Sequence, residues 1–210
     1  MKVLAADLLR SAARAADLPR DPLPQIAFVG RSNVGKSSLI NALVKRPVAR
    51  TSAAPGKTRL INLYVIALAP GAPIERFYLV DLPGYGYARG GAPSQEAFET
   101  LTREYFACPP ASRAARGELT GPTAVLQLVD IRHPGLAQDV AAHEWLTTLD
   151  RPYAAIATKS DKLSRAERSR AVQSWNNSLN TPVLPVSAAS GEGMEDLWTL
   201  IVRMLTAAPR

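Results

Sequence analysis

Cysteine is scarce in this sequence, which contains a single residue of that type, Cys108, among 210. One cysteine cannot form an internal disulfide bond, and no group of cysteine and histidine residues has the spacing of a metal site. We expect Cys108 to be an ordinary thiol in a loop. This scarcity fits a reducing compartment, and we expect the protein to be cytoplasmic.

Long apolar runs are also missing. No uninterrupted apolar stretch reaches the roughly 18 residues expected of a membrane span, and the longest candidate, around Ile61 to Ala69, contains Asn62 and Tyr64. Near the N-terminus, Asp7 and Arg10 interrupt the apolar residues before the core of a signal peptide develops. The sequence therefore predicts neither a membrane span nor secretion.

Acidic residues are fewer than basic ones. The chain has 18 Asp and Glu against 25 Lys and Arg, so its formal net charge is +7, and its sequence pI is near 9.9. Such a balance favours an anionic partner such as nucleic acid. Arginine and alanine are both abundant, however, and a bias in genome base composition would give the same excess. Charge alone therefore leaves RNA binding open.

Length and apolar content indicate one large domain. At 210 residues, 47% of them hydrophobic, the chain can bury one substantial core. Apolar runs bounded by glycine, proline and polar clusters predict strands at Gln25 to Val29, Leu60 to Leu68, Arg76 to Val80, Ala124 to Val129, Tyr153 to Ala157 and Pro182 to Val186. Helical patterns fall at Lys36 to Lys45, Ser94 to Phe106, Leu136 to Leu149, Ser164 to Leu179 and Glu192 to Leu205. This alternation predicts a three-layer α/β fold with a mostly parallel, six-stranded sheet and helices on both faces.

Two segments depart from the alternation. Only Ala69 to Ile74 separates the second and third predicted strands, which predicts a hairpin, so one edge strand should run antiparallel. In residues 1–20, Leu4, Leu8 and Ala12 have a helical spacing that predicts a short amphipathic helical extension. We expect this extension to pack on a main domain formed by residues 21–210.

A phosphate-binding pattern follows the first predicted strand. The pattern G-x-x-x-x-G-K-[ST] is matched in full by Gly30, Arg31, Ser32, Asn33, Val34, Gly35, Lys36 and Ser37, which Ser38 follows. Glycines let backbone amides turn toward the phosphates, Lys36 brings a positive charge to the β and γ oxygens, and the Ser37 hydroxyl coordinates Mg²⁺. The alternative, a plain glycine-rich turn, does not explain why the pattern lies between a strand and a helix. We expect these nine residues to bind the nucleotide.

Two further segments fit magnesium and switch elements. The third predicted strand ends in Asp81, Leu82, Pro83 and Gly84, a D-x-x-G pattern in which Asp81 would hold Mg²⁺ through water and the Gly84 amide would meet the γ-phosphate. Before the second strand come Pro55, Gly56, Lys57 and Thr58. Thr58 is a better candidate than Thr51 for a second Mg²⁺ oxygen because it lies just before the strand. Taken alone, these segments could be a common turn and a solvated loop, but the phosphate loop upstream favours the functional interpretation.

Guanine recognition is predicted by two segments late in the chain. Thr158, Lys159, Ser160 and Asp161 resemble the motif N/T-K-x-D. The Asp161 carboxylate can accept hydrogen bonds from guanine N1–H and the 2-amino group, while the Lys159 stem covers the base. Adenine lacks this donor pair, and sites built this way discriminate by roughly 10⁴-fold. After the sixth strand come Ser187, Ala188 and Ala189, whose backbone amides could bind guanine O6.

Over nearly its whole length the chain resembles the EngB (YihA/YsxC) ribosome-biogenesis GTPases, within the translation-factor-related P-loop GTPases. The stretches that carry the resemblance are Gly30 to Asn41, Pro55 to Thr58 with Leu60 to Asn62, Val80 to Ala88, Asp130 to Pro134 and Thr158 to Leu163. The resemblance implies a Ras-like G domain that binds GTP, GDP and Mg²⁺. It also implies a switch in assembly of the large ribosomal subunit or its precursor, through ribosomal RNA and proteins, that supports cell division. We expect a monomer.

A loop and a single residue depart from the pattern of this family. The loop from Cys108 to Pro122 looks longer and richer in proline and alanine, and Arg89 stands where lysine is expected. Neither touches the predicted nucleotide site, so they put contacts with partners in doubt but leave the expected GTP chemistry unaffected.

Hydrolysis should involve Lys36, Thr58 and Gly84, but Tyr85 stands directly after D-x-x-G, where many GTPases place glutamine. A phenol cannot reproduce the paired donor and acceptor of an amide. We therefore expect slow intrinsic turnover, with a partner or a cation supplying the missing element. In related GTPases an asparagine at the position of Asn33 helps to bind K⁺, so Asn33 is a candidate potassium ligand; the alternative is that it only shapes the loop.

Two other functions remain open on sequence alone. One is an ATP-using P-loop enzyme, against which Asp161 and the tripeptide at Ser187 argue. The other is an RNA- or ribosome-binding scaffold in which nucleotide is mainly structural. His133 and His143 are distant in order from the phosphate loop, and we expect no catalytic histidine.

Overall fold

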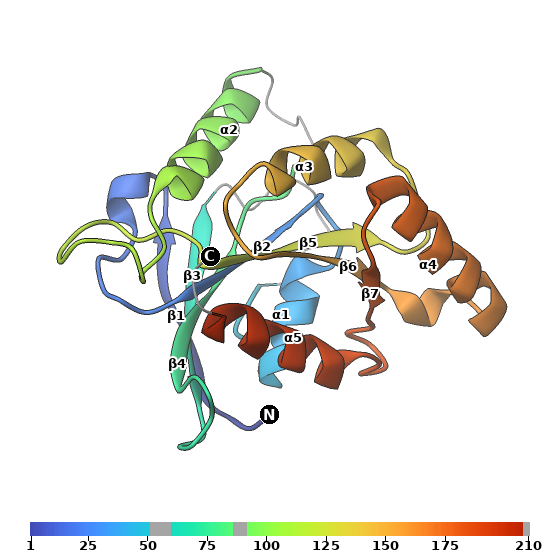
Figure 1. The fold of residues 1–210 in the computed structure, drawn as a ribbon, viewed down its shortest axis with the longest axis horizontal. Helices are drawn as coiled ribbons and strands as arrows, with labels where there is room; N and C mark the ends of the chain where they lie inside the picture. The colour runs from blue at the N-terminus through green and yellow to red at the C-terminus, as the bar shows by residue number, and fades with distance from the viewer. Residues whose placement is uncertain (51–59, 86–91, 208–210) are drawn as a thin grey trace.

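A seven-stranded β-sheet runs through the middle of the molecule, with the strand order β1-β3-β4-β2-β5-β6-β7 (Figure 1). The computed structural model describes residues 1–50, 60–85 and 92–207. The strands are β1 (Val3–Ala12), β2 (Gln25–Gly30), β3 (Ile61–Leu68), β4 (Arg76–Asp81), β5 (Ala124–Asp130), β6 (Tyr153–Thr158) and β7 (Val183–Pro185). The helices are α1 (Lys36–Val44), α2 (Ala92–Ala107), α3 (Ala137–Thr147), α4 (Arg165–Leu179) and α5 (Met194–Thr206), with short 3-10 turns η1 (Ala15–Asp17) and η2 (Ser160–Lys162).

The directions of the strands follow from the connections between them. β2 pairs in parallel with β4 and β5, and the parallel series continues through β6 to β7. β3 is antiparallel to β4, as the short connection over residues 69–74 predicted, and it is also antiparallel to β1. The predicted α/β class is confirmed. The sheet has seven strands rather than six, however, and the antiparallel strand lies one place in from the edge.

The N-terminal segment is a strand, so the prediction of a helical extension over residues 1–20 was wrong. Leu4 and Leu8, whose spacing suggested an apolar helix face, are 44% and 51% exposed, and the buried side chains of β1 are Ala6 and Ala12. Without β1, one edge of β3 would present unpaired backbone N–H and C=O groups. Pairing with β3 therefore outweighs the local helix propensity of a segment rich in alanine and leucine. Residues 3–12 belong to the sheet of the main domain.

Helices cover both faces of the sheet (Figure 1). Successive side chains of a strand point to opposite faces, so Phe28 and Val29 of β2 join different apolar clusters. The Phe28 cluster buries the apolar side chains of α1 and α5, including Trp198, and the Val29 cluster buries those of α2 and α3. A third cluster packs α4 through Trp175 against β5 and β6. Because helices pack on both faces of the sheet, the loops at the ends of the strands are where we expect a functional site.

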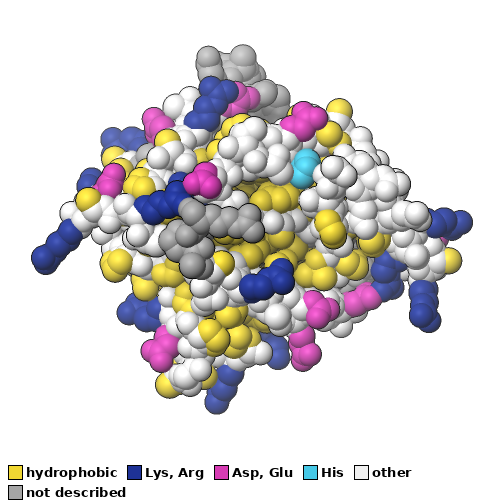
Figure 2. Space-filling view, in the orientation of Figure 1, with side chains coloured by type: hydrophobic (Ala, Val, Ile, Leu, Met, Phe, Trp, Pro, Cys, Tyr) yellow, Lys and Arg dark blue, Asp and Glu magenta, His cyan; other side chains and the backbone are white. Residues whose placement is uncertain are grey.

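The outer surface carries charges of both signs. On the face shown in Figure 2, Lys and Arg side chains are scattered around the outline, interspersed with Asp and Glu, and an apolar area lies between them. Among the described helices, none combines the length and the apolar character needed to cross a membrane. On this face the Lys and Arg side chains are therefore spread out rather than gathered into one patch.

Candidate nucleotide-binding and active site

The sequence motifs meet at one edge of the sheet. β2, β4, β5, β6 and β7 run in the same direction, so the segments at their carboxyl ends lie side by side. These segments are residues 30–37, 81–85, 130–134, 158–161 and 186–189. Four of the five predicted nucleotide motifs are therefore brought together. The remaining one, Pro55, Gly56, Lys57 and Thr58, lies outside the described residues.

The phosphate loop adopts a conformation that its residue types permit. Asn33 and Gly35 have φ angles of 63° and 109°, in the left-handed region that asparagine and glycine tolerate best. A Cβ on Gly30 would stand 2.7 Å from the Leu128 carbonyl oxygen of β5, so this position also requires glycine. α1 begins at Lys36, and the N–H groups of its first turn open toward the loop. An anion in the loop would meet these donors and the positive end of the helix dipole.

Lys36 lies across the inside of this loop. Its Nζ donates to the Gly30 carbonyl oxygen at 2.9 Å and to the Arg31 carbonyl oxygen at 3.2 Å. The residue is 9% exposed, and burial lowers its pKa while the nearby Asp81 carboxylate acts to raise it. An ammonium group has three N–H donors. The two carbonyls hold Lys36 where a phosphate oxygen could accept the third.

Ser37 and Asp81 form the candidate magnesium site. The Ser37 hydroxyl donates to Asp81 Oδ2 at 3.3 Å, and Asp81 is 2% exposed. Its other oxygen, Oδ1, is buried without a hydrogen-bond partner in the part of the chain that the structure describes. Burial raises the pKa of Asp81 to about 6, against the opposing effects of Lys36 and Ser37. An unpartnered buried oxygen is costly, and hydroxyl and carboxylate oxygens are the ligands Mg²⁺ prefers. The donor set therefore fits the predicted ion.

The segment after β4 lies directly against the phosphate loop. A Cβ on Gly84 would stand 2.5 Å from the Ser32 amide nitrogen, so only glycine permits this approach. The Ser32 amide donates to the Tyr85 carbonyl oxygen at 3.2 Å. Leu82 and Pro83 are buried, and Leu82 belongs to the apolar cluster beneath α2 and α3. These contacts hold the backbone of Gly84 beside the loop.

Tyr85 does not stand free at the position where many GTPases have glutamine. Its hydroxyl donates to Asp139 Oδ1 at 2.9 Å, and the Arg31 Nε donates to the same carboxylate at 3.2 and 3.0 Å. Asp139 is fully buried, and burial raises its pKa although the bonds from Tyr85 and Arg31 act to lower it. Sequence reasoning missed Asp139, because no local pattern marks it as buried; the two residues before it in α3, Ala137 and Gln138, are exposed.

Thr158 and Lys159 join the guanine segment to the phosphate loop. The Thr158 hydroxyl donates to the Val34 carbonyl oxygen at 2.7 Å, and Lys159 Nζ donates to the Asn33 carbonyl oxygen at the same distance. Lys159 has a φ angle of 64°, which begins the short turn η2. The base-binding segment and the phosphate-binding loop are therefore fixed to each other by two side chains.

Asp161 and Ser187 bring the two predicted guanine segments together. The Ser187 hydroxyl donates to Asp161 Oδ1 at 2.6 Å and accepts from the Ala189 amide at 3.1 Å. The bond from Ser187 is the main cause that lowers the pKa of Asp161, so the carboxylate is ionised at neutral pH. Beside it, Ser160 is buried and donates to Glu192 at 2.9 Å. An ionised carboxylate held in this way is the acceptor that the guanine edge requires.

Asp130 is a second residue that sequence reasoning left without a role. Lys159 Nζ donates to its Oδ2 at 2.9 Å, and the Arg132 guanidinium donates to both oxygens, at 2.9 and 2.7 Å. Burial alone would raise its pKa, but the hydrogen bonds from Arg132 and Lys159 outweigh burial and hold the pKa well below its usual range. The available signal was an aspartate at the carboxyl end of a buried strand. Asp130 holds Lys159 in place over the loop.

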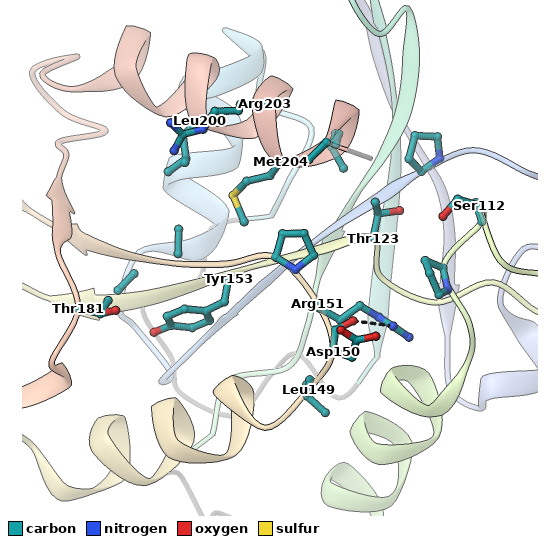
Figure 3. Close-up of a pocket in the computed structure, with 18 of the residues that line it drawn as sticks. Ser112, Thr123, Leu149, Asp150, Arg151, Tyr153, Thr181, Leu200, Arg203 and Met204 are labelled. Carbon is teal, nitrogen blue, oxygen red and sulfur yellow. Dashed lines mark hydrogen bonds between the residues drawn. The ribbon is translucent and has the colours of Figure 1, made fainter. Parts of the chain in front are cut away.

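A large cavity lies at the opposite edge of the sheet (Figure 3). Its volume is about 1240 Å³, and it is lined by the first residues of β6 and β7, by α5 and by the segment around residue 112. Figure 3 shows Arg151 bonded to Asp150 among the residues that line the cavity, together with Tyr153 and Met204. Among the nucleotide motifs within residues 1–50, 60–85 and 92–207, none contributes to the lining of this cavity, which is therefore separate from the described part of the candidate site.

Comparison with known proteins gives the chain its relatives. The family model described as a 50S ribosome-binding GTPase matches residues 25–159. The probable GTP-binding protein EngB of Pelotomaculum thermopropionicum is 40% identical over 215 residues, which cover 100% of both chains.

Solved structures agree with this fold. The crystal structure of a probable GTP-binding protein EngB has a TM-score of 0.63 at 24% identity and covers 86% of this chain and 98% of that one. Era in complex with MgGDPNP and nucleotides 1506–1542 of 16S ribosomal RNA has a TM-score of 0.71 at 20% identity, covering 90% of this chain but 58% of the Era chain. These two likenesses concern the fold. The full-length sequence match and the family model show that this chain belongs to the EngB family of GTP-binding proteins and is a P-loop GTPase.

Proposed function

We propose that this protein is a slow, Mg²⁺-dependent GTPase that acts as a switch in assembly of the large ribosomal subunit, in the cytoplasm. The observation that carries the catalytic part is Asp81, buried beside Ser37 and Lys36 with one oxygen unpartnered among the described residues. The ribosomal part is supported by the matched family's description as 50S ribosome-binding, by the net charge of +7, and by the ribosomal RNA bound in the Era complex.

The protein's own groups divide the work of binding. Backbone amides of residues 30–37 and the Lys36 ammonium hold the phosphates, and the Asp161 carboxylate accepts from the guanine edge while the Lys159 stem covers the base. Mg²⁺ bound by Ser37, Thr58 and, through water, Asp81 would offset the negative charge that develops on the phosphate oxygens. Gly84 would donate its N–H to the γ-phosphate.

Slow turnover follows from Tyr85. Its hydroxyl is bonded to Asp139, so it does not orient the attacking water as a glutamine amide would. A further cation could offset part of the developing charge. Asn33 is the proposed K⁺ ligand, because its positive φ sets it at the exposed turn of the phosphate loop. GTPase rates that are equal in potassium and sodium buffers would remove this part of the proposal.

Two measurements test the proposal. Calorimetry with GTP, GDP and ATP in Mg²⁺ buffer should show tight binding of the two guanine nucleotides and much weaker binding of ATP. Equal affinity for ATP and GTP would contradict the assignment of Asp161. Sedimentation with purified ribosomal subunits should then show binding to the large subunit or its precursor that is stronger with a GTP analogue than with GDP. Sedimentation that is the same with both nucleotides would contradict the switch.

A further inference from the structure

A buried carboxylate, Asp139, connects two of the segments that hold the phosphates. It lies in the first turn of α3 and is fully buried, although its neighbour Gln138 is exposed. Burying a carboxylate is costly unless other groups bond to it. Here its Oδ1 accepts from the Tyr85 hydroxyl and from Arg31 Nε, and its Oδ2 accepts from Arg31 Nε.

The two partners of Asp139 come from two different segments of the candidate phosphate site. Arg31 is the second residue of the phosphate loop, and Tyr85 directly follows Gly84. Their backbones also meet: Arg31 and Tyr85 form an isolated parallel bridge, and the Ser32 amide donates to the Tyr85 carbonyl oxygen at 3.2 Å. Asp139 therefore holds the Tyr85 side chain at one end while the backbone of Tyr85 is held against the loop at the other.

Asp139, which accepts the bond from Tyr85, is itself held by a hydrogen bond from Gln127. The Gln127 side chain of β5 is fully buried, and its Nε2 donates to the Asp139 carbonyl oxygen at 2.7 Å and to the Tyr85 hydroxyl oxygen at 3.3 Å. The Tyr153 hydroxyl donates to Gln127 Oε1 at 2.6 Å, and His143 Nδ1 lies 2.9 Å from that hydroxyl. A buried network whose members are satisfied is rigid. A movement of Tyr85 relative to Asp139 would break bonds rather than bend the network.

We infer that Asp139 is a positioning residue for the γ-phosphate: through the Tyr85 hydroxyl it holds the Gly84 amide against the phosphate loop, and so it favours GTP over GDP. This inference rests on the proposed function, in which the Gly84 N–H meets the γ-phosphate. GDP has no γ-phosphate. The affinity for GTP should therefore depend on the bond between Tyr85 and Asp139, whereas the affinity for GDP should not.

The chain offers a matched pair of tyrosines for the test. Tyr85→Phe removes the hydroxyl bonded to Asp139 and leaves the ion pair of Asp139 with Arg31 in place, so folding should be preserved. Tyr78→Phe is the control, because the Tyr78 hydroxyl donates at 2.6 Å to the carboxylate of Asp21, which belongs to none of the nucleotide motifs.

The measurement is the dissociation constant for GDP and for a non-hydrolysable GTP analogue, by calorimetry in Mg²⁺ buffer. Tyr85→Phe and Asp139→Ala should each weaken binding of the GTP analogue about tenfold, equivalent to about 1.4 kcal/mol, with GDP binding unchanged. The double variant should lose no more than Asp139→Ala alone, because both changes remove the bond between Tyr85 and Asp139. Tyr78→Phe should leave both affinities as in the wild type.

Other outcomes overturn the inference. An unchanged ratio of the two affinities in Tyr85→Phe, or an equal loss for both nucleotides, would mean that the network only supports the fold. Tighter binding of the GTP analogue would mean that the bond holds Gly84 away from the γ-phosphate. Wild-type protein that binds neither nucleotide would overturn the proposed function and this inference with it, whereas normal wild-type binding beside unchanged ratios in the variants would overturn this inference alone.

Discussion

Replacing Asp81 with asparagine should stabilise the nucleotide-free protein at neutral pH. Burial raises the pKa of this carboxyl from the ordinary 3.8 to about 6 in the folded protein. Between these two values the folded state keeps a proton that the unfolded state has lost, so the free energy of unfolding falls as pH rises from about 4 to about 6 and stays low above that range. The difference in pKa corresponds to about 3 kcal/mol.

The expected gain in stability follows from the size and charge of the asparagine side chain. Asparagine is nearly isosteric with a protonated aspartic acid and carries no charge, so Asp81→Asn removes the cost of ionising a buried carboxyl. The attraction of Lys36 acts to lower the pKa of Asp81, and the raised value of about 6 already includes this effect. At pH 7 we expect the variant to gain about 1 to 3 kcal/mol in the free energy of unfolding. The same change should abolish Mg²⁺-dependent GTP hydrolysis, because a neutral amide would hold the water on Mg²⁺ less strongly than a carboxylate does.

Urea unfolding of nucleotide-free wild type and variant, between about pH 4 and pH 8, measures this difference. The wild-type free energy of unfolding should fall relative to that of Asp81→Asn across the lower half of the range, and the gap should then stay constant. Asp150→Asn is a suitable control, because Asp150 is exposed and bonded to Arg113 at 2.8 Å, and it should give no such gain. A variant that is less stable than wild type at pH 7, or two pH profiles that stay parallel, would refute the reasoning.

Three further predictions concern residues other than Asp81. Asp130→Asn removes the counter-charge of Lys159 and should weaken guanine nucleotide binding about tenfold; fluorescent-nucleotide titration checks this, and unchanged affinity would contradict it. Asp161→Ala should lower GTP affinity by roughly 10³-fold or more while leaving ATP affinity unchanged, and parallel losses for both nucleotides in calorimetry would contradict it. In β1, Leu8→Lys should change the free energy of unfolding by about 0.5 kcal/mol or less because Leu8 is exposed, whereas Ala6→Lys should lower it by roughly 3 kcal/mol because Ala6 is buried. Urea unfolding measures both changes, and a larger loss for Leu8→Lys than for Ala6→Lys would favour a helix.

The backbone shape of the phosphate loop and of the D-x-x-G segment could be predicted because their glycines encode it. Gly35 occupies a positive φ, and Gly30 and Gly84 lie where a Cβ would strike the Leu128 carbonyl or the Ser32 amide. Because only glycine fits these positions, the glycines in the sequence pattern predict the local backbone structure. The helix starts follow the same logic: α4 was expected from residue 164, and Ser164 is its N-cap, in a capping box with Glu167.

The features that could not be predicted depend on partners far along the chain. The bond between Arg31 and Asp139 joins residues 108 positions apart, and no local pattern marks the two as partners. β1 is a strand because β3 lies beside it; its own sequence favours a helix. Local propensity decides where a helix begins, but it does not decide which polar side chain a distant segment will bury.

Three aspartates surround the phosphate loop, and their partners separate their roles. Asp130 is bonded to Lys159 and an arginine, and Asp139 to Arg31 and a tyrosine, so both are balanced by the protein itself. Asp81 has a serine hydroxyl on one oxygen, and the other is unpartnered among the described residues. A cation that arrives with the nucleotide would therefore lower the free energy mainly at Asp81, because the other two charges are already offset. Asp81 ends β4, directly before the segment that carries Gly84, so the stabilisation from the ligand would act on the element that the proposed switch would move between GTP and GDP.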